Sequence, residues 1–176
     1  MHPQFQLEQQ TATLLHINPR PEKHGEENVP AADLKVEVRD GSHLLSMFHP
    51  TLRSMLYKAD ESEGGLDGVE QPLTVLRFGT LIERLRLDLS LKGADVVIGF
   101  GLGGVSDISL DTVDVDSFSV TLSEGGTVGM TFRVKARPTG EQIKKLYEVM
   151  GCEITVSVTP AVEKQGSLGL PVAVEA

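Results

Sequence analysis

The chain has 176 residues, which fits a single domain, and 40% of them are hydrophobic. A net charge of −9 and a pI near 5.0 argue against a simple duplex-DNA-binding protein, which usually carries a basic balance. The single cysteine, Cys152, excludes an intramolecular disulfide, and no signal peptide or membrane span is evident.

The first part of the chain combines strand-like and irregular segments. Residues 4–17 predict one or two strands, whereas residues 18–32 contain three prolines and predict no regular element. Leu34, Val36 and Val38 alternate with charged residues, which predicts a strand.

The following segment changes to a helical period. Apolar residues recur three and four positions apart over 43–58, and Pro50 predicts a kink or a division into two short helices. Residues 59–71 are rich in acidic residues and glycine without periodicity, which predicts a surface loop. Residues 73–81 predict a further strand that leads into the next part of the chain.

Four strand-like segments then follow one another. They are residues 85–91, 96–102, 113–122 and 128–136. Their period-2 alternation is typical of half-buried antiparallel strands. Tight turns at 92–95 and 123–127 would join them into two hairpins.

The inward-facing side of this region changes parity twice. Inward residues fall at even positions up to Leu110, at odd positions from Val113, and at even positions again from Phe118. Because each change requires one extra residue, we expect a β-bulge or a corner near Asp111 and another near Asp116.

The C-terminal part begins with a helix signal. Thr139 and Gln142 form a capping box before an apolar stripe, and Gly151 suits the left-handed position after the helix. Residues 153–159 predict a last strand. The sequence therefore predicts a mainly β fold with two helical segments, an α+β protein whose antiparallel meander closes as a barrel or folds as a sandwich. We expect one domain over 1–160 and a loosely ordered tail over 161–176.

Two motifs resemble ligand sites but lack part of the required pattern. Gly99, Gly101 and Gly104 spell G-x-G-x-x-G, yet a dinucleotide site needs a helix to begin there, and the alternation that follows predicts a strand. An EF-hand loop that began at Asp107 or Asp111 would lack its glycine and its final glutamate. We therefore predict no metal and no cofactor at either place.

A third cluster lies around His24. Glu22, Glu26 and Glu27 flank this histidine, and such residues could hold a metal ion or an acid–base pair. A metal-dependent hydrolase centred on His24 is therefore one hypothesis. The spacing matches no standard zinc motif, there is no G-x-S-x-G elbow, and we assign no catalytic residue and expect no enzyme.

The charged residues of the predicted hairpins are separated by sign. Basic residues alternate with apolar ones on two strands and define a candidate surface for nucleic acid or a protein partner: Arg77, Arg84, Arg86, Arg133, Lys135 and Arg137. Acidic residues define a second candidate partner surface: Asp107, Asp111, Asp114 and Asp116. If the basic strands share one face, they would form a cationic stripe suited to phosphates. Stacking of bases would also need exposed aromatic rings, but Phe78, Phe100, Phe118 and Phe132 fall at positions expected to be buried.

Two blocks in the first third of the chain show a resemblance. Residues 18–38 (NPRPEKHGEENVPAADLKVEV) and 47–57 (MFHPTLRSMLY) resemble accessory proteins encoded by tailed phages and prophages. The resemblance implies a setting in recombination, replication or evasion of host defence, and it carries no catalytic residue with it.

These observations support three functional hypotheses. The first is a phage-type accessory protein that binds single-stranded nucleic acid. The second is an inhibitor that binds a host defence nuclease or mimics nucleic acid through its acidic segments, and the third is the hydrolase at His24. For all three we expect a cytoplasmic protein with no membrane partner, and homo-oligomers are compatible with a small sheet protein.

Overall fold

The structure is a computed structural model that describes residues 5–62, 64–101 and 103–161. The predicted tail lies outside these residues except for Ala161. The strands are β1 (Leu7–His24), β2 (Glu27–Gly41), β3 (Tyr57–Ala59), β4 (Leu73–Leu76), β5 (Arg84–Leu87), β6 (Leu91–Gly99), β7 (Ile108–Leu122), β8 (Thr127–Ala136) and β9 (Glu153–Thr159). The helices are α1 (Leu52–Leu56) and α2 (Gly140–Glu148), with 3-10 turns η1 (Ser42–Met47), η2 (Gly79–Leu81) and η3 (Gly104–Ser106).

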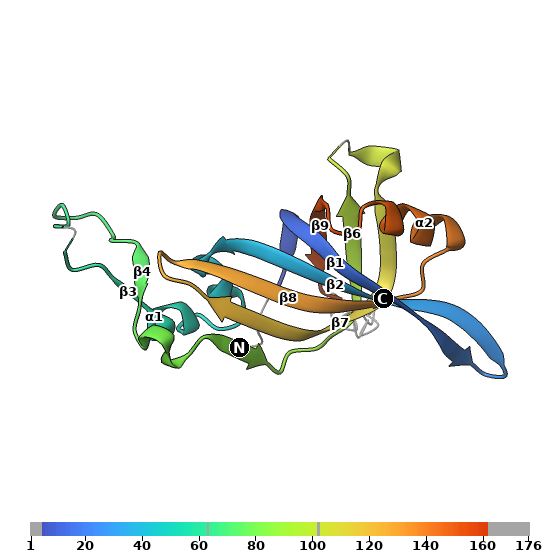
Figure 1. The fold of residues 1–176 in the computed structure, drawn as a ribbon, viewed down its shortest axis with the longest axis horizontal. Helices are drawn as coiled ribbons and strands as arrows, with labels where there is room; N and C mark the ends of the chain where they lie inside the picture. Colours follow the sequence, from blue (N-terminus) through green and yellow to red (C-terminus); the bar gives the residue numbers. More distant parts are fainter. Residues whose placement is uncertain (1–4, 63, 102, 162–176) are drawn as a thin grey trace, which may run out of the picture.

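Six strands close an antiparallel barrel in the order β1-β2-β8-β7-β6-β9, and β9 pairs back with β1 (Figure 1). The short strand β5 is added outside this ring along β7. The predicted mainly β, antiparallel fold is confirmed, and it closes as a barrel. Within the ring, β6, β7 and β8 form a meander, whereas the pairs β2–β8 and β6–β9 join segments far apart in the chain.

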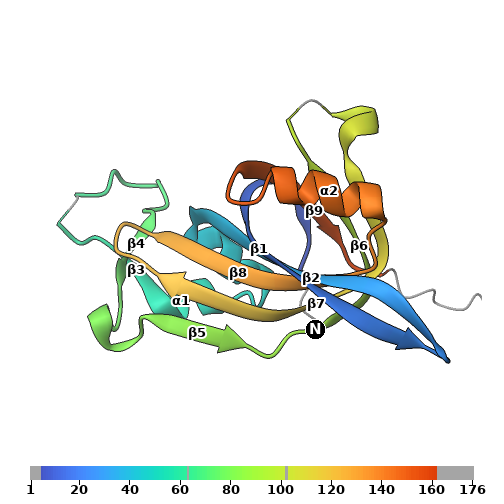
Figure 2. The ribbon, with the colours of Figure 1, turned by 45° about the vertical axis from the view of Figure 1, so that its right-hand side comes forward.

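The β1–β2 hairpin is longer than the sequence predicts and projects beyond the barrel (Figures 1 and 2). Residues 18–32 were expected to hold no regular element, and this expectation is wrong. Pro21 lies opposite Pro30 in the pairing register, and neither residue has an N–H to donate to the partner strand. This part of each strand has no second strand beside it in the described fold, and prolines are tolerated at such an edge.

One of the two predicted hairpins is confirmed. β7 and β8 are joined through the turn at 123–127 and pair from Leu122↔Val128 onward. The turn expected at 92–95 is wrong, because β6 runs through it and β5 pairs with β7. Gly93 has φ +67°, and the pairing register shifts on both sides of Ala94, so these residues make an irregularity in one strand where a chain reversal was expected.

Both predicted bulges in β7 are present. Thr112 and Ser117 adopt left-handed backbone conformations with φ of 55° and 58°, directly after Asp111 and Asp116. The β7–β8 register shifts between Asp116 and Ser119. Each bulge restores the alternation, so β7 keeps its apolar side chains inside and its carboxylates outside along the whole strand.

The core contains four mutually packed aromatic rings. Phe5, Phe48, Phe118 and Phe132 have neighbouring ring centroids between 4.8 and 6.2 Å apart. The expected burial of Phe118 and Phe132 is confirmed. Phe78 and Phe100 are exceptions, because Phe78 is 49% exposed beside η2 and Phe100 is only partly buried.

The helical segments were predicted close to their positions. η1 and α1 lie on either side of Pro50, as the division into two short helices requires. α2 begins with the predicted capping box of Thr139 and Gln142, and it buries Leu146.

The segment between β2 and β5 includes an arm made of β3, β4 and the exposed loop that joins them (Figure 1). The predicted surface loop at 59–71 is confirmed within the described residues. The expected strand at 73–81 is shorter, because β4 ends at Leu76 and η2 follows. None of the helices in the described ranges has the length and apolar character needed to cross a membrane.

Candidate functional site

The outward side chains of β5, β7, β8, β2 and β1 form one continuous polar face, because these strands are neighbours in the sheet. The register places Arg86 of β5 opposite Ser119 of β7, and Ser119 in turn opposite Thr131 of β8. Further along β8, the rows become charged, and Arg133 lies between Asp116 of β7 and Lys35 of β2. The two ends of this face therefore differ in chemistry.

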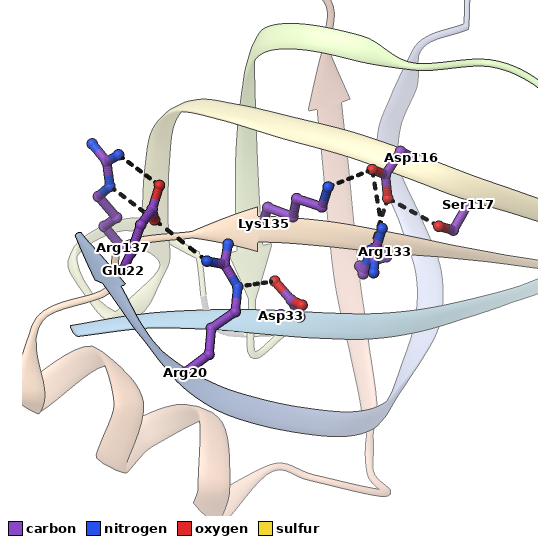
Figure 3. A network of polar contacts seen from close by, with 8 residues as sticks. All are labelled: Arg20, Glu22, Asp33, Asp116, Ser117, Arg133, Lys135 and Arg137. Carbon is purple, nitrogen blue, oxygen red and sulfur yellow. Dashed lines mark hydrogen bonds and ion pairs between the residues drawn. The ribbon is translucent and has the colours of Figure 1, made fainter. Parts of the chain in front are cut away.

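A network of ion pairs occupies the charged end of the face (Figure 3). Arg133 binds both carboxylate oxygens of Asp116, at 2.8 and 3.2 Å, and Lys135 Nζ lies 2.8 Å from the same carboxylate. Partial burial alone would raise the pKa of Asp116. The hydrogen bonds from Arg133 and Lys135 outweigh this effect and hold the pKa of Asp116 well below its ordinary value.

The network continues onto the projecting end of the β1–β2 hairpin, residues 18–32, which we call the β1–β2 ribbon. Arg137 donates to both carboxylate oxygens of Glu22, at 3.3 and 2.9 Å, and these hydrogen bonds lower the pKa of Glu22. Arg20 Nε donates to Asp33 at 2.9 Å, and Arg20 Nη1 lies 3.6 Å from Glu22 Oε2. These contacts connect the ribbon to the end of β8 in the barrel.

The predicted acidic surface is partly neutralised by the same kind of contact. Lys92 donates to Asp114 at 2.8 Å, and this hydrogen bond lowers the pKa of Asp114. Asp111 is exposed and has no hydrogen bond or ion pair among the described residues. Asp107 lies near Gly99 of β6, and its Oδ1 atom is buried without a described hydrogen-bond partner.

We call one pocket on this face the Arg84 pocket. Its volume is about 370 Å³, and it is lined by His16, Asn18, Asp33, Lys35, Arg84, Ser117, Ser119, Thr131, Phe132 and Arg133. Three cationic side chains meet several hydroxyl groups here. Within the part of the chain that the structure describes, neither Lys35 nor Arg84 has an ion pair.

The second pocket, the Arg137 pocket, lies between the β1–β2 ribbon, the first half of β7 and α2. Its volume is about 550 Å³, and it is lined by Arg20, Glu22, Ser109, Leu110, Asp111, Thr112, Val113, Asp114, Lys135, Arg137 and Gln142. Its lining carries basic and acidic groups together. The two pockets adjoin, because Arg133 and Lys135 are successive outward residues of β8.

The predicted basic residues are divided among several places. Arg84 and Arg133 line the Arg84 pocket, and Lys135 and Arg137 line the Arg137 pocket. Arg86 lies on the same face and lines a separate pocket of about 410 Å³ with Asp88 and Asp116. Arg77 lies apart from them, where its Nε donates to the carbonyl of Ser54 at 2.6 Å.

The structure gives little support to a metal centre at His24. This residue ends β1 at the tip of the ribbon, while Glu22 is engaged by Arg137. No group of three histidine, cysteine or acidic side chains close enough to share a metal occurs within the described ranges. Cys152 is exposed and follows α2.

Sequence reasoning missed Lys35 and the hydroxyl groups of Ser119 and Thr131. A signal for Lys35 was present, since it alternates with the buried Leu34 and Val36 and must face outward. That Lys35 lies beside Arg133 could not be predicted in this way, because the β2–β8 pairing joins segments far apart in the chain.

Comparison of the chain with protein-family models, with curated proteins and with solved structures found no match. The two pockets are therefore the features from which we propose a function.

Proposed function

We propose that this chain is a binding protein for single-stranded nucleic acid and that a phosphate of the strand occupies the Arg84 pocket. The observation that carries the proposal is the meeting of Lys35, Arg84 and Arg133 with the hydroxyls of Ser119 and Thr131 in a chain of net charge −9. A local cationic pocket on an acidic protein concentrates attraction for an anion at one place.

Two of these cations have no ion pair within the described part of the chain, and this supports an anionic ligand. Lys35 and Arg84 can approach a phosphate without first leaving a carboxylate, whereas Arg133 would share its guanidinium with Asp116. Guanidinium and ammonium groups form charge-assisted hydrogen bonds with phosphate oxygens, and hydroxyl groups add further donors.

Two features favour a single strand over a duplex. The pocket volume of about 370 Å³ falls in the range of small-ligand sites, which suits a nucleotide unit. The outward arginines of β5, Arg84 and Arg86, would provide a cationic track for the backbone of one strand.

The test is binding of fluorescently labelled oligonucleotides of about 20 nucleotides, followed by anisotropy over a series of salt concentrations. The double variant Lys35→Gln, Arg84→Gln should bind more weakly, and each lost phosphate contact should lower the salt slope by about 0.7. Lys58→Gln, Lys144→Gln removes the same charge from exposed positions outside the pocket and serves as the matched control.

Absence of binding by the unmodified protein at low salt would overturn the proposal. Equal losses in the pocket variant and the control would also overturn it, since the attraction would then depend on total charge alone.

The other hypotheses gain no specific support. The engagement of Asp114 by Lys92 and of Asp116 by Arg133 leaves less open acidic surface for a nucleic-acid mimic. The phage or prophage setting rests on the resemblance of residues 18–38 and 47–57, and it stays a prediction.

A further inference from the structure

The Arg137 pocket is larger than the Arg84 pocket and lies next to it, but each of its cations already forms an ion pair within the protein. Arg137 is held by Glu22, Arg20 by Asp33, and Lys135 by Asp116 (Figure 3). A phosphate would have to share each of these cations with a carboxylate, and none of the described cations of this pocket is without an ion pair. The pocket therefore suits a different part of a ligand.

One charged group in this pocket has no partner among the described residues. Asp111 is exposed at the pocket wall, and the neighbouring hydroxyls of Ser109 and Thr112 can donate or accept. The amide of Gln142 is already engaged, because it accepts from Thr139 N at 2.9 Å and donates to the carbonyl of Ser109 at 3.3 Å. A ligand that presents an N–H donor to Asp111 would therefore complement the carboxylate that the fold leaves open.

We infer that the Arg137 pocket receives a nucleobase and favours bases with an exocyclic amino group over thymine or uracil. The inference rests on the proposed function, in which the phosphate backbone lies at the adjoining Arg84 pocket. A carboxylate accepts well from the amino group of cytosine, whereas thymine presents a carbonyl at the same position. A volume of about 550 Å³ falls in the range of ligand pockets.

The structure also indicates how the pocket keeps its shape. The Glu22–Arg137 pair joins the ribbon wall to the end of β8, and Asp111 precedes the bulge at Thr112 with φ of 55°. Thr112 N donates to Asp95 at 3.0 Å, which fixes the backbone beside Asp111. An acceptor on a fixed backbone discriminates better than one on a mobile loop.

The experiment compares oligodeoxycytidylate with oligothymidylate of the same length, about 20 nucleotides, using the full chain at one salt concentration. Both are pyrimidine strands with the same backbone, so the ratio of their affinities isolates the base. A slightly alkaline buffer prevents protonation of cytosine. We expect the cytosine strand to bind at least about tenfold tighter, the effect of one hydrogen bond to a charged acceptor.

Asp111→Asn should bring the ratio close to one. Both strands are expected to bind it more tightly in absolute terms, because a negative charge is removed. Asp67→Asn, at an exposed position of the loop between β3 and β4, removes the same charge and should leave the ratio unchanged.

The outcomes separate the inference from the proposed function. Equal affinities for the two strands, or tighter binding of thymidylate, would overturn base selection while the phosphate site stands. A ratio that survives in Asp111→Asn would also overturn the assignment of this pocket. Binding of neither strand would overturn the proposed function itself.

Discussion

The Arg84 pocket and the Arg137 pocket share one sheet face but use their cations in different ways. In the Arg137 pocket, Arg137 binds Glu22 and Lys135 binds Asp116. In the Arg84 pocket, Lys35 and Arg84 have no ion pair within the described chain. The contrast teaches that a basic strand pattern does not by itself define an anion site, since the neighbouring strand decides whether the charge is available.

The same strand, β7, produces both environments. Its first half presents Asp114 and Asp116 to β8, and its second half presents Ser119 and Thr121. The bulge at Ser117 separates the two halves. The paired carboxylates Asp114 and Asp116 of the first half are therefore expected to stabilise the fold, and the unpaired cations beside the second half are expected to bind a ligand.

The largest effect on stability is expected for Asp116→Asn. Loss of the carboxylate that holds Arg133 and Lys135 should lower the free energy of unfolding by about 2 kcal/mol at neutral pH, the usual range for hydrogen bonds to charged groups. Urea unfolding followed by circular dichroism measures it. Asp111→Asn on the same strand is the control and should change stability by less than about 0.5 kcal/mol. Equal effects would contradict the division between the two kinds of charge.

The difference between the native protein and Asp116→Asn should depend on pH. The hydrogen-bonded carboxylate has a lowered pKa in the folded protein, so its contribution to stability is full above about pH 5 and is lost progressively as the pH falls. Urea unfolding of both proteins at neutral pH and at two acidic pH values measures the trend. A difference that stays constant into the acidic range would show that Asp116 acts through packing and not through its charge.

A smaller effect is expected in a comparison of two lysines on neighbouring strands. Lys35→Gln should weaken oligonucleotide binding about fivefold, because an unpaired cation is lost from the phosphate site. Lys135→Gln should change the affinity by less than about twofold, because its charge is already engaged by Asp116. Anisotropy titrations of both variants measure this. The reverse order of effects would place the phosphate in the Arg137 pocket.

The sequence predicted the parts of the fold that depend on local signals. The turn at 123–127, the bulges next to Asp111 and Asp116, and the capping box of Thr139 all follow from neighbouring residues. The prediction of no regular element at the prolines of residues 18–32 was wrong. Prolines are tolerated at an unpaired strand edge, and the sequence does not show which strand edges the closed barrel leaves unpaired.

The candidate site was predictable in part. The β7–β8 turn and the bulge together place Asp116 opposite Arg133, so their ion pair could have been derived from the sequence. The neighbourhood of Lys35 and Arg84 could not, because it needs two pairings between distant segments, β2 with β8 and β5 with β7.

The smallest effect on stability is expected for Glu22→Gln, which releases Arg137 from its ion pair. Both side chains are substantially exposed, at 32% and 50%, and exposed ion pairs contribute little because solvent screens them and their side chains lose entropy. The thermal midpoint should not move measurably. Oligonucleotide affinity should rise by about twofold at low salt, because Arg137 then lies unpaired beside the bound oligonucleotide.

Arg137→Gln is the matched control, because it breaks the same ion pair but removes the cation and keeps the carboxylate of Glu22. Its thermal midpoint should also stay constant, while its oligonucleotide affinity should fall or stay level. If both variants lose stability, the Glu22–Arg137 contact holds the ribbon against the barrel and belongs to the folding of the molecule. If only Glu22→Gln gains affinity, the carboxylates of the Arg137 pocket neutralise its cations. The phosphate of the oligonucleotide then binds in the Arg84 pocket because its cations are unpaired within the described chain.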